Sequence, residues 1–286
     1  MKNIITAAGL LLLILAIGCQ EGPEISHETT WWVHADTHVG HATYEHQLSN
    51  AIEDVNALNI SDYAITLGDC VDERKRHEIF TDPHVSWSAY ESKMNTLHHD
   101  WTYVLGNHDN DGREIPVHAV TTPNYFSKNI HGVRIIGISD EHLSDDYTRH
   151  LEMSREQIEF VMDELNNAPD KPTIIMSHQG IQESREGRDD GIPFLKENVI
   201  PDIDQYNIVL VVNGHWHEWQ IIENVLGYGF DQIAINDILY DMESSFMTIR
   251  ELDETIEISF RFRNHQDRQW ITVQGREKYI LEIPKQ

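Results

Sequence analysis

Residues 208–217 read IVLVVNGHWH, an apolar run that ends in a small polar cluster. A short apolar run bounded by turn-forming residues predicts a buried strand, and here a glycine and two histidines follow the end of that strand. The same arrangement occurs at residues 101–109, which read WTYVLGNHD. A predicted strand that ends in metal-ligating side chains therefore recurs along this chain.

Five such clusters lie between residues 36 and 217. They are Asp36-Thr37-His38, Gly68-Asp69, Gly106-Asn107-His108-Asp109, Ser177-His178 and Gly214-His215-Trp216-His217. The candidate ligands among them are two carboxylates, one amide oxygen and four imidazoles, with one histidine to spare. This donor set suits two neighbouring divalent cations that share a carboxylate, and such a pair of metals is suited to splitting phosphate esters.

Strand and helix patterns alternate over most of the chain. Helical spacing of apolar residues predicts helices near 48–58, 87–97 and 154–165, and Ser154 with Gln157 forms a capping box for the last of them. Predicted strands lie at 31–34, 63–67, 101–105, 133–138, 173–176 and 208–212, followed by β-type segments at 246–250, 255–262 and 270–283. The pattern predicts an α/β core with a β-rich C-terminal part. Ligands of such sheets bind beyond the carboxyl ends of the strands, where all five clusters lie.

The first residues have a different composition from the rest. After Lys2, residues 4–17 are almost wholly apolar, too few for a comfortable bilayer span but typical of a secretory signal. Residues 15–19, LAIGC, resemble a bacterial lipobox, in which Cys19 becomes the lipidated first residue. An ordinary signal peptide or an uncleaved anchor is the alternative. We expect an exported protein that is lipid-anchored to a membrane of the bacterial cell envelope, divided into a signal peptide (1–18), a lipidated tether (19–29) and one domain (30–286).

The charge balance is strongly acidic. The chain has 48 acidic and 21 basic residues, a formal net charge of −27. This charge repels polyanions and there is no basic stripe, so duplex nucleic acid is excluded as a substrate. Cys70, the second of two cysteines, directly follows Asp69, and we expect it to be a small buried thiol.

The ordered set of clusters resembles the calcineurin-like metallophosphoesterase superfamily, over essentially the whole mature domain. The resemblance implies a two-sheet αββα sandwich of that type, with two divalent metal ions at the strand ends. It assigns the first metal to Asp36, His38 and His217, the second to Asn107, His178 and His215, and the bridging position to Asp69. The mixture of imidazole and carboxylate donors suits Mn, Zn, Fe or Ni.

His108 is not needed as a ligand. The resemblance places it beside the leaving-group oxygen, which it either protonates or stabilises in charge while a metal-bridging hydroxide attacks phosphorus. Asp72 or Asp109 would hold its second ring nitrogen, and Asp72 is favoured because it lies three residues after Asp69.

Two positions depart from known subfamilies. Purple acid phosphatases carry a metal-bound tyrosine where this chain has Asp72, so an iron–tyrosinate centre is not expected. Protein serine/threonine phosphatases carry an arginine at the position of Glu73 and end their histidine motif with glutamate, where this chain has Asp109. A protein phosphatase is therefore not expected either.

The predicted function is hydrolysis of a phosphodiester or a small phosphomonoester. His41, just past the first motif, and Trp216, between two predicted ligands, are candidates for substrate contact, although packing is an equal alternative for Trp216. A catalytically silent, metal-containing envelope protein that binds a phosphorylated ligand is the main alternative. It is disfavoured because the chain retains every predicted ligand as well as His108. A dinuclear zinc peptidase would need more carboxylate ligands and different spacings.

Overall fold

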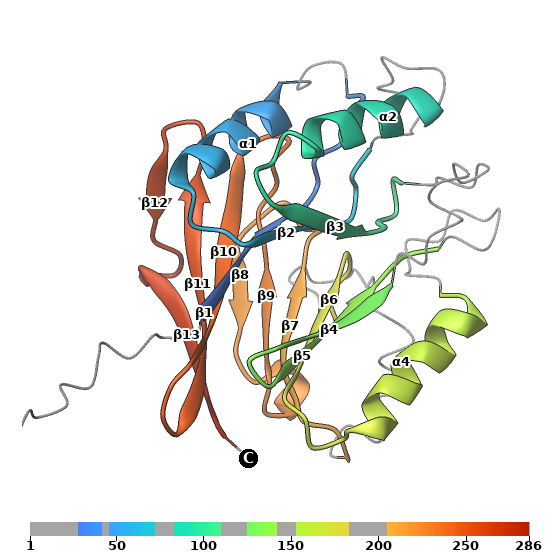
Figure 1. Cartoon of the computed structure of the whole chain (residues 1–286), viewed down its shortest axis with the longest axis vertical. Helices are drawn as coiled ribbons and strands as arrows, with labels where there is room; N and C mark the ends of the chain where they lie inside the picture. The colour runs from blue at the N-terminus through green and yellow to red at the C-terminus, as the bar shows by residue number, and fades with distance from the viewer. Residues whose placement is uncertain are drawn as a thin grey trace, which may run out of the picture.

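The computed structural model of the chain describes residues 28–41, 46–71, 83–109, 125–141, 153–182 and 205–285. Within these ranges two β-sheets face each other, with helices on their outer sides (Figure 1). The predicted signal peptide, Cys19, most of the predicted tether and Asp72 lie outside the described residues. The expected α/β sandwich with a strand-rich C-terminal part is confirmed.

The first sheet is built from both ends of the domain. Its described strands are β1 (Glu28–His34), β2 (Tyr63–Leu67), β3 (Asp100–Val104), β10 (Glu243–Glu251), β11 (Thr255–Asn264), β12 (Gln269–Ile271) and β13 (Lys278–Pro284). Their order is β12-β11-β10-β1-β2-β3, and β13 also pairs with β11. β1, β2 and β3 are parallel, whereas the C-terminal strands are antiparallel. Glu28 and Thr29, at the end of the predicted tether, already pair with β10.

The second sheet comes from the middle of the chain. Its described strands are β4 (Phe126–Ile130), β5 (Val133–Ile138), β6 (Thr173–Ser177), β7 (Ile208–Asn213), β8 (Gln220–Ile222) and β9 (Asp231–Ala234). Their order is β4-β5-β6-β7-β9-β8. β5, β6, β7 and β9 are parallel, so their carboxyl ends meet at one edge.

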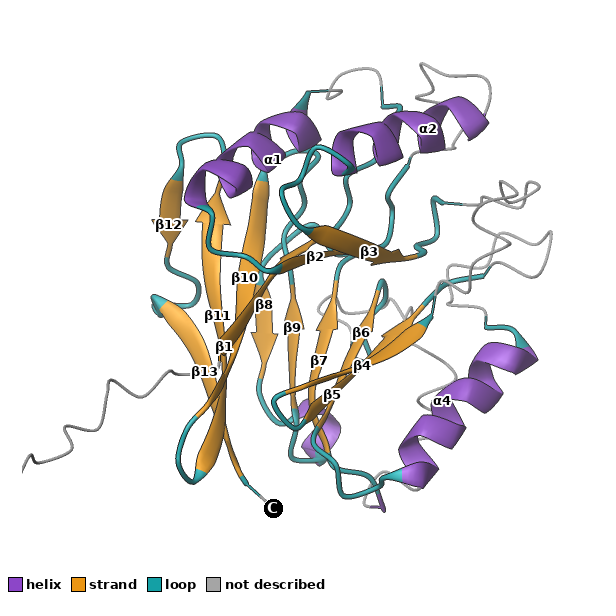
Figure 2. Cartoon of the chain, viewed as in Figure 1, coloured by secondary structure: helices purple, strands orange, loops and turns teal. Residues whose placement is uncertain are grey.

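Three described α-helices cover the sheets. α1 (Gln47–Leu58) and α2 (Pro83–Met94) lie on the outer side of the first sheet, and α4 (Arg155–Asn167) lies on the second (Figure 2). Among the described residues, no helix is long and apolar enough to cross a bilayer. A one-turn 3-10 helix, η3 (Val225–Gly227), precedes β9.

Side chains along each strand point alternately into the space between the sheets and toward the helices outside. Ile65 and Leu67 of β2 point inward and pack with Leu210 and Val212 of β7 between the two sheets. Ala64, the residue before Ile65, points outward into the layer beneath α1 and α2. Because successive strand residues face opposite sides, each strand contributes to two apolar layers.

Several element boundaries differ from the sequence prediction. Ser154 caps α4 by accepting a hydrogen bond from the Gln157 amide at 3.2 Å. The Gln157 side chain does not complete the predicted capping box, because it bonds both backbone groups of Ser139. The Ser154 amide donates instead to the Glu141 carboxylate. Leu97 lies beyond the end of α2, and β4, β8 and β9 were not predicted.

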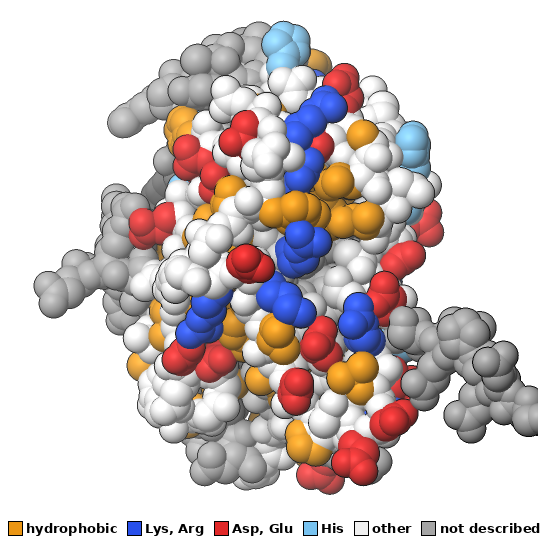
Figure 3. All heavy atoms as spheres, turned by 90° about the vertical axis from the view of Figure 1, so that its left-hand side faces the viewer, with side chains coloured by type: hydrophobic (Ala, Val, Ile, Leu, Met, Phe, Trp, Pro, Cys, Tyr) orange, Lys and Arg blue, Asp and Glu red, His pale blue; other side chains and the backbone are white. Residues whose placement is uncertain are grey.

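The surface mixes charges of both signs. On the face turned toward the viewer in Figure 3, basic side chains lie close to acidic and apolar ones. Among the described residues, Arg250 pairs with Glu28 at 2.7 Å and Lys285 pairs with Glu251 at 3.0 Å. Exposed pairs of this kind contribute little to stability, typically about 0–1 kcal/mol each.

Candidate metal centre

The predicted ligands follow the carboxyl ends of parallel strands from both sheets. Asp36 and His38 follow β1, Asp69 follows β2, Asn107 follows β3 and His178 follows β6, while His215 and His217 follow β7. The structure brings these residues together at one edge of the sandwich. We call the seven the candidate metal centre: Asp36, His38, Asp69, Asn107, His178, His215 and His217.

The backbone of this centre is strained. Positive φ angles are uncommon for residues other than glycine and cost about 1–3 kcal/mol each, so they persist only where the surrounding structure enforces them. Most of the predicted ligands have such angles: Asp36 (53°), His38 (42°), Asp69 (51°), His215 (70°) and His217 (56°). Backbone strain of this kind gathers at functional sites, where it aims side chains inward.

Two glycines allow the strand-end loops to approach one another. A Cβ atom on Gly68, whose φ is +78°, would lie 2.6 Å from the His178 ring. One on Gly106 would lie 2.4 Å from Asp69 Oδ1. Glycine is therefore required in both clusters, because any side chain would push the loops apart.

The first group of donors consists of Asp36, His38 and His217. Their ligand atoms all lie within 4.8 Å of one another. His217 Nε2 lies 3.3 Å from Asp36 Oδ1, and His38 Nε2 lies 3.8 Å from the same oxygen. These are the three residues that the family resemblance assigns to one metal.

The second group is centred on His178. Its Nε2 atom lies 3.3 Å from Asp69 Oδ2, 3.0 Å from Asn107 Oδ1 and 3.1 Å from His215 Nδ1. His178 Nδ1 donates to the Leu67 carbonyl oxygen at 2.8 Å. Because a carbonyl can only accept, this bond fixes the proton on Nδ1 in the neutral ring and turns the Nε2 lone pair toward the other donors.

Asp69 lies between the two groups. Its Oδ2 atom is 3.6 Å from His38 Nε2 and 3.3 Å from His178 Nε2, so one oxygen faces both. Its Oδ1 atom accepts a hydrogen bond from the His108 amide at 2.7 Å, which fixes the carboxylate. A carboxylate that bridges two cations has to occupy such a position.

Three buried polar atoms of the centre lack a hydrogen-bond partner among the described residues. They are Asp36 Oδ1 and both ring nitrogens of His38. Buried polar atoms are nearly always paired, and leaving one unpaired costs about 1–3 kcal/mol. The unpaired oxygen and His38 Nε2 belong to the first donor group, so a divalent cation would satisfy both. The donor set therefore fits metal binding.

Proton affinities in the centre are strongly coupled. Burial raises the pKa of Asp36, but the neighbouring His217 outweighs it and lowers the pKa to about 2. Burial alone would lower the pKa of His178, but the Asp69 carboxylate outweighs burial and raises this pKa to about 10. For His217 the same burial effect is outweighed by Asp36 and Asp237, so its pKa is about 11. Without metal, protons occupy positions that cations would take.

His108 lies beside the centre and its side chain is 13 % exposed. Its ring is 4.6 Å from that of His38, and its Nε2 lies 3.8 Å from Asp69 Oδ2. Asp109 is buried, and its two oxygens accept hydrogen bonds from the amides of Val71 (2.9 Å) and Gly106 (2.7 Å). These bonds hold the loop that carries His108. Whether Asp109 or Asp72 also orients its ring stays a prediction.

The remaining predicted residues lie close to the ligand loops in sequence. His41 and Trp216 are half-buried. The His41 amide donates to the His38 carbonyl, and the Trp216 amide donates to the Gly214 carbonyl. A substrate contact for either one stays a prediction. Cys70 is fully buried, as expected, and burial raises the pKa of its thiol.

Sequence reasoning missed Asp237. This residue follows β9, and its Oδ2 atom lies 3.0 Å from His217 Nδ1, on the side of the ring opposite the metal-facing nitrogen. Its Oδ1 atom accepts hydrogen bonds from the amides of Tyr240 (2.5 Å) and Asp241 (3.2 Å). A carboxylate in this position fixes the orientation of a ligand histidine. The available signal was an aspartate just past an apolar run, but that run was not recognised as a strand.

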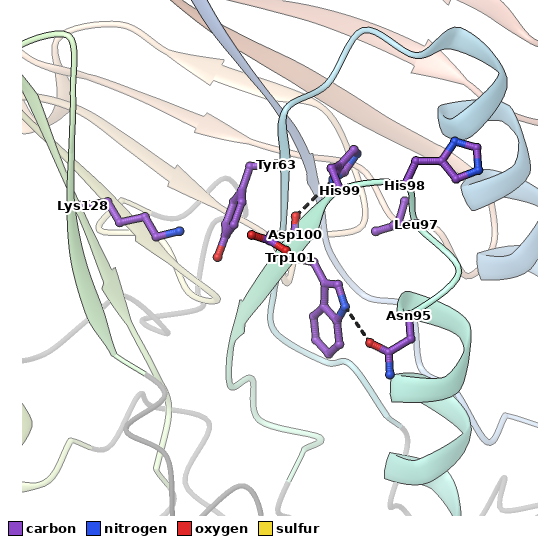
Figure 4. Close-up of a pocket in the computed structure, with 8 residues that line it drawn as sticks. All are labelled: Tyr63, Asn95, Leu97, His98, His99, Asp100, Trp101 and Lys128. Carbon is purple, nitrogen blue, oxygen red and sulfur yellow. Dashed lines mark hydrogen bonds between the residues drawn. The ribbon is translucent and has the colours of Figure 1, made fainter.

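A separate hollow of about 480 Å³ lies where β2 and β3 begin, at the strand ends opposite the metal centre (Figure 4). In this hollow Lys128 reaches over Tyr63, with Nζ 3.4 Å from the ring centroid. Trp101 Nε1 donates to Asn95 Oδ1 at 3.2 Å. No set of metal-ligating atoms among the described residues gathers there.

The model of one protein family, calcineurin-like phosphoesterase, matches residues 30–219 and so spans all the clusters. The chain belongs to the calcineurin-like phosphoesterase family. Membership makes it a metal-dependent phosphoesterase and confirms the resemblance on which the ligand assignment rests. No match was found among curated proteins.

Solved structures share the family fold at low sequence identity. A dimetal phosphatase from Danio rerio is 13 % identical, with a TM-score of 0.60 over 90 % of this chain and 98 % of that one. GAP50, the anchor in the inner membrane complex of Plasmodium, is 14 % identical, with a TM-score of 0.61 over 91 % and 89 %. The protein TT1561 of Thermus thermophilus is 13 % identical, with a TM-score of 0.50 over 87 % and 99 %. At this identity the likeness shows the fold alone.

Proposed function

We propose that this phosphoesterase hydrolyses small phosphodiesters or phosphomonoesters of low charge with two divalent cations. Asp36, His38 and His217 would hold the first cation, and Asn107, His178 and His215 the second. Asp69 would be shared between them. The proposal is supported by the two donor groups, which the Asp69 carboxylate joins.

The unpaired buried atoms carry this proposal. A hydrogen-bonded cluster of histidines and carboxylates could be purely structural, but His38 Nε2 and Asp36 Oδ1 have no hydrogen-bond partner among the described residues. When bound, the cations supply Lewis-acid stabilisation of the phosphoryl oxygens and activation of water. The imidazole, carboxylate and amide donors suit Mn, Zn, Fe or Ni.

The charge of the donor set favours an anionic substrate. Only Asp36 and Asp69 bring negative charge, whereas Asn107 is neutral and the imidazoles bind metals in their neutral form. Two divalent cations therefore leave net positive charge at the site, which attracts a phosphate group. The acidic remainder of the chain opposes large polyanions.

His108 would serve as the proton donor to the leaving group. It belongs to neither of these two donor groups, although its ligand atom also lies within 4.8 Å of those of His38 and Asp69, and its partly exposed ring lies beside the shared Asp69. A histidine in hydrogen-bond reach of a departing oxygen contributes about 10²–10⁴-fold to the rate.

A second candidate is a metal-containing protein that binds a phosphorylated ligand without hydrolysing it. The likeness to GAP50, which is described as an anchor, shows that this fold also occurs in a protein named for attachment. The complete donor set and the retained His108 favour hydrolysis. Turnover of any phosphoester by the metal-loaded protein would decide between the two.

The decisive experiment couples metal analysis to an activity panel. Metal-stripped protein is reloaded with Mn, Zn, Fe or Ni, its metal is counted, and chromogenic monoesters and diesters are assayed. We expect two ions per chain and hydrolysis of at least one ester class. Failure to bind any of these metals in stoichiometric amounts would refute the proposal.

A substitution tests the role of His108 separately. His108→Ala should keep both metals and lower turnover by about 10²–10⁴-fold. The exposed His98, at the opposite strand ends, gives the matched control His98→Ala, which should behave like wild type. Undiminished turnover in His108→Ala would remove its assigned role.

We further propose that the protein is exported and lipid-anchored through Cys19 in the bacterial envelope. The N-terminal composition and the lipobox-like residues 15–19 support this location. Mass spectrometry of the mature N-terminus should find an acylated cysteine. An unmodified chain that begins at another residue would refute the anchor.

A further inference from the structure

We propose that Tyr240 is a specificity residue, which receives an uncharged aromatic group of the phosphoester substrate. This inference rests on the proposed function, because it requires a phosphoester at the candidate metal centre. Tyr240 is 51 % exposed, and its ring centroid lies 5.7 Å from that of His217. Single exposed aromatic residues are ordinary, but this one contacts a predicted metal ligand.

Ring contacts connect Tyr240 to the rest of the centre. The centroid of His217 is 5.6 Å from that of His38, which is in turn 4.6 Å from that of His108. Tyr240 and His108 thus stand at opposite ends of a series of four neighbouring rings. A substrate bound over the ligands between them has separate groups within reach of each end.

The centre is accessible to solvent at His217, the ligand whose ring neighbours Tyr240. The His217 side chain is 30 % exposed, whereas those of Asp36 and His178 are fully buried. A substrate must reach the cations from an accessible side, and the described residues there include Tyr240. Its neighbour His217 is therefore the ligand over which an organic group would extend.

The turn that carries Tyr240 is firmly held. Asp237 Oδ1 accepts a hydrogen bond from the Tyr240 amide, and Asp237 Oδ2 faces His217 Nδ1. Ile238 and Leu239, which lie between them, are buried in the core. One carboxylate thus positions both the ligand and the tyrosine, so the ring has a defined place relative to the centre.

The surroundings of Tyr240 determine the class of group that it would bind. Asp241 is exposed next to it and the chain carries a formal net charge of −27, so a second anionic group is disfavoured. Tyrosine rings stack well with other aromatic rings, which adds to the gain from burying apolar surface. A neutral aromatic substituent on the phosphoester fits both conditions.

Paired substrates test this assignment. Benzyl phosphate and cyclohexylmethyl phosphate differ in aromaticity but release similar alcohols, and each variant is compared with wild type on the same substrate. Tyr240→Ala should lower kcat/KM for the benzyl ester by about tenfold, the size of one aromatic contact, and change the cyclohexylmethyl ester much less. Tyr240→Phe should retain the preference for the benzyl ester over the cyclohexylmethyl ester.

The control variant is Tyr228→Ala. Tyr228 is 40 % exposed and stacks on Phe230 beside η3, and its loss should leave the preference unchanged. Equal losses on both substrates in Tyr240→Ala would overturn the proposal, as would no loss on either. A selective loss on choline phosphate would also overturn it, because that would indicate recognition of a cation.

A binding measurement separates this proposal from the proposed function. The affinities of benzylphosphonate and cyclohexylmethylphosphonate, which cannot be hydrolysed, are measured by calorimetry on the metal-loaded protein. Tyr240→Ala should weaken the benzyl compound selectively and leave the metal content unchanged. If wild type binds the phosphonates but hydrolyses no ester, the proposed hydrolytic function is refuted while the Tyr240 assignment stands. Failure of wild type to prefer the benzyl compound would overturn the assignment.

Discussion

Two buried clusters among the described residues contain histidine and aspartate, but their polar atoms are satisfied to different degrees. One is the candidate metal centre at the strand ends. The other, which we call the Ser244 network, lies between α1 and the first sheet and consists of Trp32, Asp54, Ser244, Arg263 and His265. Comparing them shows which features make a cluster functional.

The Ser244 network has the connectivity of a hydrolytic triad. Ser244 Oγ lies 2.6 Å from His265 Nε2, and His265 Nδ1 lies 2.9 Å from Asp54 Oδ2. However, Trp32 Nε1 donates to Ser244 Oγ, and Arg263 binds both oxygens of Asp54. All three triad residues are at most 2 % exposed. With its polar atoms paired and no access for substrate, this network is structural.

The candidate metal centre differs on both points. His38 and Asp36 keep buried atoms that no described residue satisfies, and His217 and His108 are partly exposed. The ligand loops also carry strained backbone angles, whereas no residue of the Ser244 network has a positive φ. Unpaired atoms, strain and access therefore mark the functional cluster better than residue type does.

The largest expected effect is on activity and comes from the shared ligand. Asp69→Asn keeps the size of the side chain but removes the charge that faces both donor groups. We expect kcat/KM to fall by about 10³-fold or more, because several kcal/mol of metal-dependent stabilisation is lost. Metal content should fall in parallel, as measured by elemental analysis.

The matched control for Asp69→Asn is Asp163→Asn in α4. Asp163 is exposed, so its substitution should change neither metal content nor activity. A fully active Asp69→Asn enzyme would contradict the assignment of a shared ligand.

Substitution in the Ser244 network should lower the stability of the protein and leave its activity unchanged. Asp54→Ala leaves Arg263 and His265 without their carboxylate, and breaking a buried pair of this kind costs about 3–5 kcal/mol in the free energy of unfolding. Chemical denaturation measures this loss. The molecules that remain folded should bind metal and turn over substrate as wild type does. If activity per folded molecule collapsed instead, the contrast between the two clusters would be wrong.

The next effect concerns the orientation of a ligand. Asp237→Asn should weaken metal binding by about 10–100-fold, because His217 loses the carboxylate beside Nδ1. Excess metal should restore activity, which distinguishes weakened binding from misfolding. The exposed neighbour gives the control Asp241→Asn, which should retain wild-type affinity. Equal affinity in the Asp237 variant would show that the histidine needs no such partner.

Asp237 also marks the limit of what the sequence could predict. The five clusters were predictable because each combines an apolar run with a glycine or ligand residue at its end, and their order matches one family. The strand before Asp237 spans only Asp231–Ala234 and begins with a polar pair, so it gave no clear periodic signal.

The Ser244 network could not be predicted for a different reason. Asp54 lies in α1 and His265 follows β11, more than 200 residues later. Nothing local in either segment specifies that they meet, since the contact arises from the packing of α1 on the antiparallel strands. Local patterns predict elements and their termini, but pairs between distant elements depend on the complete fold.

A smaller loss of stability is expected for Ser244→Ala. The substitution leaves Trp32 Nε1 and His265 Nε2 without their shared partner, at a cost of about 1–3 kcal/mol. Phosphoester turnover should be unchanged, since Ser244 is buried away from substrate. Reaction of wild-type Ser244 with a fluorophosphonate probe would show that the network is accessible after all.

The pH dependence of stability gives the finest comparison. Burial would raise the pKa of Asp54, but His265 and Arg263 outweigh it and hold that pKa well below its usual range. Because the folded pKa is depressed, Asp54 stabilises the protein above the unfolded pKa of about 4, and this contribution is lost as the pH falls. Urea unfolding of the metal-free protein between pH 7 and pH 3 should therefore show a shallower decline in Asp54→Asn than in wild type. Parallel curves would mean that Asp54 contributes no pH-dependent stability, and the network would then be held by packing alone.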